Sequence, residues 1–294
     1  MKHHILTITA LLISFLPFYS FAQDSTKCKE EWKWDLEKTE EWQAWLNKKP
    51  AISLDYGFSN VSRKDVEAPF ADNNLLELKL GYTYKKVTKY ADYIDKSTFN
   101  YLFLNRNSTE LAGGSDVPSD IETNNWQFGV GWSGGYGYKI GENATVTPYY
   151  TSSLTWTNLN FADDSLSPND ERIKQLYDES FRFGTSSEGG VRVQATSLIA
   201  LEAGYERSIV FERHLFWKWA GSGIIELAAN GLLDVFIKEV FKSSPAAGPI
   251  VFFVLKSALG YGIYELRRDK MNWPFPSTPP IAFDNVKFGV TFTF

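Results

Sequence analysis

Few side chains in this sequence are placed to do chemistry. Ser208, Glu212 and His214 lie close together, and a serine, a carboxylate and a histidine can together activate a nucleophile. Their spacing does not reproduce the motifs of enzymes that use such trios. Apart from His3 and His4, His214 is the single histidine, and a lone histidine cannot build a histidine-rich metal site. We therefore assign no catalytic residue and no metal site.

A glycine-rich segment is the second candidate. Gly129, Gly131 and Gly134 fit the pattern GxGxxG, which binds a dinucleotide when a strand precedes it and a helix follows it. Here the glycines lie inside an alternating segment that Tyr136 and Tyr138 continue, so no helix follows. We predict glycines that leave room for large neighbours on the inward face of a strand, and no cofactor.

Composition restricts the class of protein. The chain has 294 residues and a net charge of −5, and its mean hydropathy is −0.26. The negative charge argues against a nucleic-acid partner, and the low hydropathy excludes a bundle of transmembrane helices. Aromatic residues make up 16% of the chain and suit many short β-strands. Cys28 is the single cysteine, so no disulfide framework is expected.

Residues 1–22 have the features of a secretory signal peptide. Lys2 precedes the apolar stretch 5–18, and Ser20 and Ala22 are the small residues expected before a cleavage site. The chain is therefore predicted to be exported.

Residues 23–49 follow as a predicted amphipathic helix. Trp32, Leu36, Trp42 and Leu46 fall on one face, and Pro50 marks the end of the helix. Two interpretations stay open. One is an ordinary helix packed on the protein, and the other is an interfacial helix anchored in a membrane by its tryptophans.

From residue 51 the apolar pattern changes to a period of two, which is typical of β-strands. Eight segments alternate in this way, and most reach about ten residues, the length with which a tilted strand crosses a bilayer. They lie at 52–58, 76–84, 99–103, 126–140, 146–156, 181–193, 199–211 and 286–294. Long and short connections alternate between them, as in a membrane barrel with long outer loops and short periplasmic turns. The predicted fold over residues 50–294 is an all-β, eight-stranded antiparallel up-and-down transmembrane barrel.

The opposite face of these strands carries charged side chains, while the aromatic face is expected to turn toward lipid. We expect the charges to line the lumen: Asp55, Glu77, Lys79, Lys85, Lys139, Arg182, Glu188, Arg192, Glu202, Glu206 and Lys287. An eight-stranded barrel is just wide enough to be filled by side chains. Charges of both signs would therefore pair and close the lumen.

The last eight residues carry a terminal signal. Lys287, Gly289, Phe292 and Phe294 fit the order polar-x-Gly-x-x-aromatic-x-aromatic that outer-membrane barrels present to the barrel assembly machinery. The chain thus resembles the small outer-membrane β-barrel class, of which the OmpA membrane domain and OmpX are members. The resemblance implies insertion into the outer membrane of a Gram-negative bacterium, with outer-membrane lipid and the assembly machinery as partners.

Residues 213–270 depart from this class, in which a polar loop precedes the last strand. Two segments, 221–241 and 246–267, predict an α-helical hairpin insertion. Charged residues interrupt both, so neither reaches the roughly 18–20 apolar residues of a spanning helix. We expect an extracellular cap that packs on itself and on the barrel rim. The alternative is a docking surface for a protein or lipid partner.

These features favour an outer-membrane barrel with a structural or interaction role and a lumen closed by paired charges, and we do not expect an enzyme. A small pore or transporter for apolar compounds is the second interpretation. A lipid A-modifying enzyme is the third, because outer-membrane acyltransferases and lipid A deacylases use trios like Ser208, Glu212 and His214.

Overall fold

The computed structural model describes residues 48–113, 121–141, 144–161, 166–178 and 180–294. The predicted signal peptide at 1–22 lies outside these residues, and so does nearly all of the predicted helix at 23–49. Lys49, the last residue of that helical range, instead begins the first strand.

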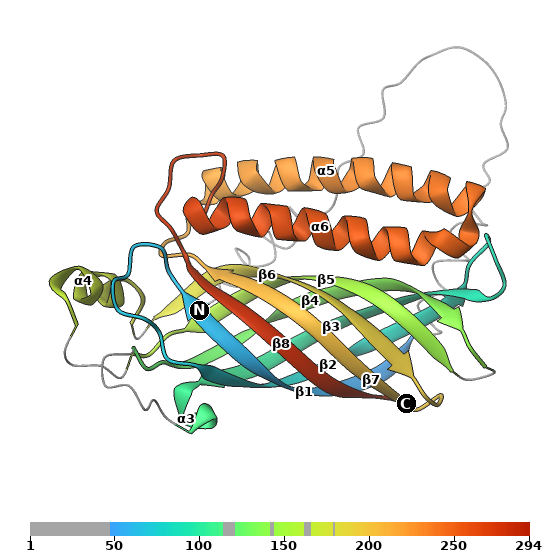
Figure 1. The fold of residues 1–294 in the computed structure, drawn as a ribbon, viewed down its shortest axis with the longest axis horizontal. Coiled ribbons are helices and arrows are strands. Elements are labelled where there is room, and N and C mark those ends of the chain that lie inside the picture. The colour runs from blue at the N-terminus through green and yellow to red at the C-terminus, as the bar shows by residue number, and fades with distance from the viewer. Residues whose placement is uncertain (1–47, 114–120, 142–143, 162–165, 179) are drawn as a thin grey trace, which may run out of the picture. The chain divides into compact units, whose positions relative to one another are not determined.

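Eight antiparallel strands form a closed barrel in sequence order, which confirms the predicted fold (Figure 1). β1 pairs with both β2 and β8, so the ring has no free edge. The strands are β1 Lys49–Ser62, β2 Asn73–Val87, β3 Ile94–Ser108, β4 Asn124–Lys139, β5 Thr145–Asn158, β6 Phe181–Gln194, β7 Ile199–Val210 and β8 Ile281–Thr293.

Long and short connections alternate as the sequence predicted. The long ones, at 63–72, 109–123, 159–180 and 211–280, meet at one end of the barrel, called here the long-loop end. They include α3 (Thr109–Ala112) and α4 (Pro168–Tyr177). The short ones, at 88–93, 140–144 and 195–198, define the opposite, short-turn end.

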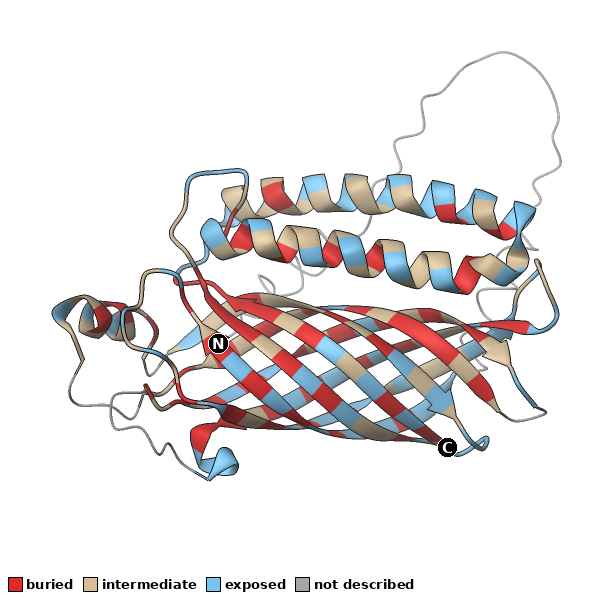
Figure 2. Ribbon diagram, in the orientation of Figure 1, coloured by how far each residue is buried: buried red, intermediate tan, exposed pale blue. Residues whose placement is uncertain are grey.

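Alternation along each strand separates an apolar outside from a polar inside. On β1, Ile52, Leu54 and Phe58 are 39%, 52% and 56% exposed, whereas Ser53 and Asp55 are almost fully buried. Buried and exposed residues alternate in the same way along the other strands (Figure 2). The period of two places every second side chain in the lumen.

β3 reverses the expected orientation of its aromatic residues. Phe99, Tyr101 and Phe103 point inward and form a buried cluster, while Leu102 and Leu104 face outward. The expectation that this aromatic face meets lipid was wrong, because both faces of β3 are apolar and periodicity alone cannot distinguish them.

The glycines of β4 explain how bulky rings fit in so narrow a barrel. A Cβ at Gly129 would lie 2.8 Å from the ring of Phe103, and one at Gly131 would overlap the ring of Tyr101. Both glycines therefore leave room for large inward neighbours, as predicted. Gly134, the third glycine of the GxGxxG pattern, faces outward into open space, so its predicted inward position was wrong.

The predicted helical hairpin lies between β7 and β8. It consists of α5 (Phe216–Ser243), a short 3₁₀ turn η1 (Pro245–Ala247) and α6 (Gly248–Asp269). Both helices run along the barrel, and α6 packs against the outer wall formed by β4, β5, β6 and β7 (Figure 1). The hairpin thus covers the wall of the barrel rather than its rim, which corrects the expected cap.

Both hairpin helices are long and apolar enough to cross a membrane, by length and composition. At 1.5 Å per residue they measure about 42 Å and about 33 Å, against a hydrocarbon thickness of about 30 Å. Some of the charges that argued against spanning helices pair between the two helices. Glu226 lies 2.9 Å from Arg267, and Asp234 lies 2.7 Å from Lys256.

Candidate functional site

The middle of the lumen holds a network of buried ion pairs. Lys287 of β8 lies 2.9 Å from Glu77 and 2.7 Å from Glu188, and it also contacts Glu206. Lys79 of β2 lies 3.2 Å from Glu77 and 3.3 Å from Asp55. All six side chains are nearly inaccessible to solvent. Each lysine therefore joins carboxylates that come from several strands, and the network ties the barrel wall together across its interior.

A second layer lies next to this network toward the short-turn end. Arg192 forms two hydrogen bonds with the Glu202 carboxylate, at 2.8 and 3.2 Å, and its guanidinium lies over the rings of Phe99 and Tyr149. The Tyr149 hydroxyl donates to Glu188. The sequence did not single out Tyr149, although its even spacing from Thr147 and Thr151 marks the inward face of β5.

The long-loop end is closed by apolar side chains. Ile173 and Tyr177 of α4 pack with Val61, Leu159, Val210, Ile281 and Phe283 in one buried cluster. Arg63, just after β1, donates to the Tyr177 hydroxyl at 2.6 Å and to the Asp65 carboxylate at 2.6 Å. α4 and the first long loop therefore form a plug over this end of the lumen.

Two side chains of the plug, Asp65 and Tyr177, have shifted pKa values. Burial raises the pKa of Asp65, but the hydrogen bond and the charge of Arg63 outweigh it and hold that pKa below its usual range. Burial raises the pKa of the Tyr177 phenol. The ion pair between Arg63 and Asp65 is therefore present at neutral pH.

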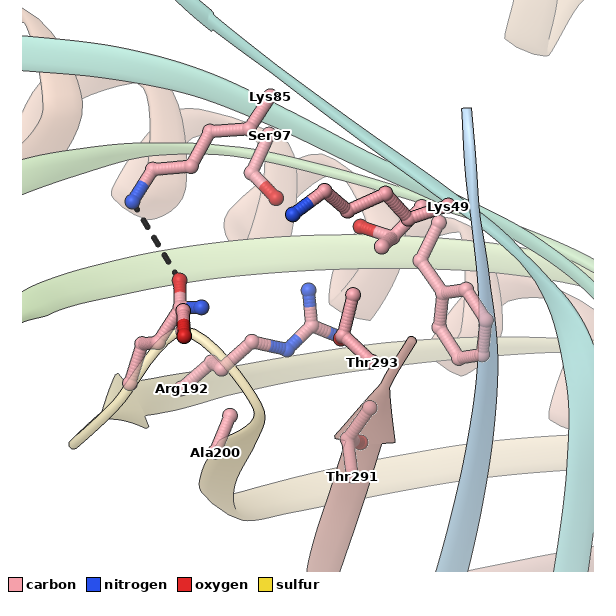
Figure 3. A pocket seen from close by; sticks show the side chains of 11 residues that line it. Lys49, Lys85, Ser97, Arg192, Ala200, Thr291 and Thr293 are labelled. Atoms are coloured by element: carbon pink, nitrogen blue, oxygen red, sulfur yellow. Dashed lines mark hydrogen bonds between the residues drawn. The ribbon is translucent and has the colours of Figure 1, made fainter. Parts of the chain in front are cut away.

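The short-turn end is open to a cavity of about 240 Å³. Lys49, Lys85 and Arg192 point into this space from β1, β2 and β6 (Figure 3). Lys85 donates to Gln194 at 3.3 Å and lies 3.2 Å from Asp95, which also lies 3.3 Å from Lys139. The cavity ends at Arg192, where the charged layers begin.

The predicted lumen charges thus differ in their surroundings. Asp55, Glu77, Lys79, Glu188, Arg192, Glu202, Glu206 and Lys287 meet in the two layers. Lys85 and Lys139 share Asp95 at the short-turn mouth. Arg182 stands apart toward the long-loop end, and its Nε is buried without a hydrogen-bond partner. Asp95, which the sequence analysis did not name, joins the two mouth lysines.

The four residues of the C-terminal motif occupy two faces of β8. Lys287 belongs to the ion-pair network, and a Cβ at Gly289 would overlap the Asp55 carboxylate. Phe292 and Phe294 are 39% and 63% exposed on the outside. The glycine and the lysine therefore have a packing role in the folded barrel, whatever their part in assembly.

The three candidate catalytic residues, Ser208, Glu212 and His214, lie in three different environments. Ser208 is buried on the inward face of β7, and the Glu212 carboxylate accepts from Arg63 at 3.4 Å. The His214 ring packs among Phe183, Phe216 and Trp219, and burial lowers the pKa of this histidine. Among the described residues, no group of three or more His, Cys, Asp or Glu side chains is arranged to hold a metal ion.

The wall beneath α6 carries an ion pair on its outward face. Arg207 of β7 lies 3.8 Å from Asp284 of β8, and its guanidinium lies 4.4 Å from the ring centres of Tyr205 and Tyr261. The Tyr264 hydroxyl of α6 donates to Asp284 at 2.9 Å. α6 therefore covers an ion pair on the outside of the barrel. The sequence analysis did not name Arg207 and Asp284, because only charges on the inward face were considered as candidates.

Small residues allow α6 to approach the strands closely. A Cβ at Gly189 of β6 would lie 2.7 Å from the Ser257 hydroxyl, and a Cβ at Gly260 would lie 2.5 Å from the Tyr150 hydroxyl. Larger side chains at either position would push the helix away from the wall. Glycines on the two facing elements thus define where the hairpin lies.

Comparison with known proteins gives structural neighbours only. No protein-family model and no curated protein sequence matches the chain. The fold is similar to Neisserial surface protein A, at 12% identity and a TM-score of 0.37, over 83% of this chain and 97% of that one. It is also similar to Ail, the attachment invasion locus protein of Yersinia pestis, at 9% identity and a TM-score of 0.34, over 84% and 99%. A third similar structure is a de novo designed transmembrane β-barrel, at 9% identity and a TM-score of 0.27, over 84% and 95%. Identities this low carry no information about function.

Proposed function

We propose that this chain is an integral β-barrel of the outer membrane of a Gram-negative bacterium, with a structural or interaction role. The proposal rests mainly on the two faces of the barrel wall, because the outward face is apolar and the inward face is charged or polar. On β1, Leu54 and Phe58 are more than half exposed, while Asp55 between them is 3% exposed. A barrel in water would place these side chains the other way round.

The same apolar surface continues around the barrel. Exposed outward residues occur on seven strands: Leu76, Leu78, Leu80 and Tyr82 on β2, Leu102 and Leu104 on β3, Trp126, Phe128 and Trp132 on β4, Phe181, Val191 and Val193 on β6, Leu201 and Tyr205 on β7, and Val286, Phe288 and Phe292 on β8, besides those on β1. A soluble monomer rarely exposes contiguous apolar patches of more than a few hundred Å². A band of this kind is what lipid covers in membrane barrels.

The filled interior supports an anchoring role over a transport role. The ion-pair layers occupy the middle of the lumen, and the α4 plug covers the long-loop end. Water and solutes could pass through the barrel only if the ion-pair layers and the α4 plug both moved aside. The surfaces left for interaction are the long loops, which we assign to the cell exterior, and the hairpin on the wall.

The experiment is expression of the full chain in a Gram-negative host, followed by membrane fractionation. We expect the protein in the outer-membrane fraction, with migration on gels that differs between heated and unheated detergent extracts. In planar bilayers we expect no ion conductance. Recovery from the soluble or inner-membrane fraction without a heat-dependent shift would overturn the membrane assignment, and steady conductance would overturn the closed lumen.

We further propose that the C-terminal motif directs assembly. Phe292 and Phe294 are exposed and lie outside the ion-pair network, so the double change Phe292→Ala and Phe294→Ala leaves that network in place. We expect less folded barrel in the outer membrane, together with unchanged refolding in detergent. The matched control is Val286→Ala and Phe288→Ala, which removes two exposed outward side chains of β8 outside the motif, and equal loss in both variants would argue against a signal.

A further inference from the structure

A groove separates α5 from the outer wall of the barrel. α6 packs on β4 to β7, whereas α5 packs mainly on α6 (Figure 1). α5 reaches the wall only near its two ends, where Trp219 packs on Phe183 and where Ile237 and Phe241 pack with Ile94. The space between α5 and the outward face of β3, β4 and β5 has a volume of about 590 Å³. Binding sites for small amphiphiles have volumes of this order.

The groove has a mixed lining and is cationic at one end. Thr98 and Asn100 of β3 and Ser152 of β5 contribute polar groups to its strand side. Trp132, Phe241 and Phe252 line it from β4, α5 and α6. Lys96, at the start of β3, and Lys238, near the end of α5, line it toward the short-turn end. Both lysines are exposed, and neither has an ion-pair partner within the described part of the chain.

The middle of the groove is polar but internally paired. Lys256 lies 2.7 Å from Asp234 and donates to the Asn230 side chain at 2.9 Å. Asp234 therefore offsets Lys256 and leaves the positive charge of Lys96 and Lys238 uncompensated. The site is complementary to a ligand with a negative group at one end and an apolar body.

The position of the charged end matches the level of a lipid headgroup. Tyr90, Tyr136 and Tyr138 surround this end, and tyrosine is enriched where membrane meets water. Basic residues at that level attract anionic lipids. Farther along, Gly134 lies on the groove floor, and a Cβ there would meet nothing within 4 Å. The floor is thus open where an acyl chain would run.

We propose that this groove binds one anionic phospholipid of the surrounding bilayer. Its phosphate lies at the end lined by Lys96 and Lys238, and an acyl chain runs past Trp132 over Gly134. The proposal rests on the membrane location proposed above, because it takes the ligand from the leaflet at the short-turn end. It gives the hairpin a role that a self-packed helical cap would not have.

The test uses the full chain purified in detergent and native mass spectrometry after incubation with phosphatidylglycerol or, separately, with phosphatidylcholine. We expect one phosphatidylglycerol to remain bound and phosphatidylcholine to bind much more weakly. The double variant Lys96→Gln and Lys238→Gln should weaken phosphatidylglycerol binding roughly 30-fold, because each basic residue contributes about a factor of five. Lys48→Gln with Lys270→Gln is the control of equal charge away from the groove.

A second variant tests the apolar part without changing charge. Gly134→Phe should fill the floor and reduce binding, whereas Gly231→Phe, on the exposed part of α5, should not. Equal retention of both lipids, no retained lipid, or equal effects in variant and control would overturn the proposal. Fractionation and the heat-dependent gel shift of the same variants report the membrane location separately, so the two proposals can fail independently.

Discussion

Lys79 and Glu188 lie 3.9 Å apart, Nζ to Oε2, although they belong to β2 and β6, which stand opposite each other in the ring of eight strands. A contact between opposite strands is possible only where no open channel separates them. The charged side chains of this barrel therefore connect opposite strands through ion pairs, and the interior is a packed polar core.

The first prediction concerns the contribution of these ion pairs to the stability of the barrel. Lys287→Met should lower the free energy of unfolding by about 3–5 kcal/mol, because Glu77, Glu188 and Glu206 would lose a shared cation in a buried site. Urea unfolding in detergent, followed by tryptophan fluorescence, measures the change. Lys64→Met removes the exposed pair with Asp269 and should change stability by only about 0–1 kcal/mol. Similar losses in both variants would show that the network does not brace the barrel.

The second prediction concerns the fit between β3 and β4. Gly131→Val should destabilise the barrel by about 1–3 kcal/mol, because the added side chain would overlap the Tyr101 ring. Tyr101→Ala in the same chain should recover part of the loss. Gly134→Val faces open space and should fold normally. If Gly134→Val lowered the stability and Gly131→Val did not, residue 134 would face the lumen and residue 131 the outside, contrary to the structure.

The third prediction tests where the hairpin lies. The Cβ positions of residues 189 and 257 are 3.5 Å apart, which is within the range of about 3.5–4.5 Å that a disulfide needs. In a Cys28→Ser background, Gly189→Cys with Ser257→Cys should form a disulfide between β6 and α6. Cleavage after Arg213 should then leave two fragments that separate on gels only with reductant.

The control for that disulfide is Gly189→Cys with Gly262→Cys, since a Cβ at Gly262 of α6 meets nothing within 4 Å. Disulfide formation in the control alone, or in neither variant, would mean that α6 does not pack on the wall as described.

The fourth prediction concerns acid stability of the plug. Because the pKa of Asp65 is held below its ordinary value of 3.8, its contribution to stability is fully present above pH 3.8 and is lost as the pH falls through the lower folded value. Asp65→Asn should therefore be less stable than the wild type at neutral pH. The difference should vanish on acidification, measured as free energies of unfolding from about pH 7 to about pH 2.

The exposed Asp72 in the same loop provides the comparison for this titration. Asp72→Asn should lie near the wild type throughout the range, because no hydrogen bond or ion pair of its carboxylate occurs within the described residues. A constant difference between wild type and Asp65→Asn at all pH values would argue against the ion pair with Arg63.

The sequence by itself determined the barrel. Alternation at Leu76, Leu78 and Leu80 against Glu77 and Lys79 assigns residues to two faces without any knowledge of distant contacts, since a strand turns successive side chains to opposite sides. The long and short connections then gave the up-and-down order. These signals are local, and that is why the number and order of the strands could be predicted.

The tertiary structure alone decided which side the aromatics of β3 take and where the hairpin lies. Phe99 and Leu102 are equally apolar, so only the space left by Gly129 and Gly131 on the next strand sends the rings inward. Asp234 and Lys256 looked like interruptions of two helices, but they pair with each other, 22 positions apart, where α5 packs on α6. Contacts between residues so far apart in sequence are set by packing, which no local pattern encodes.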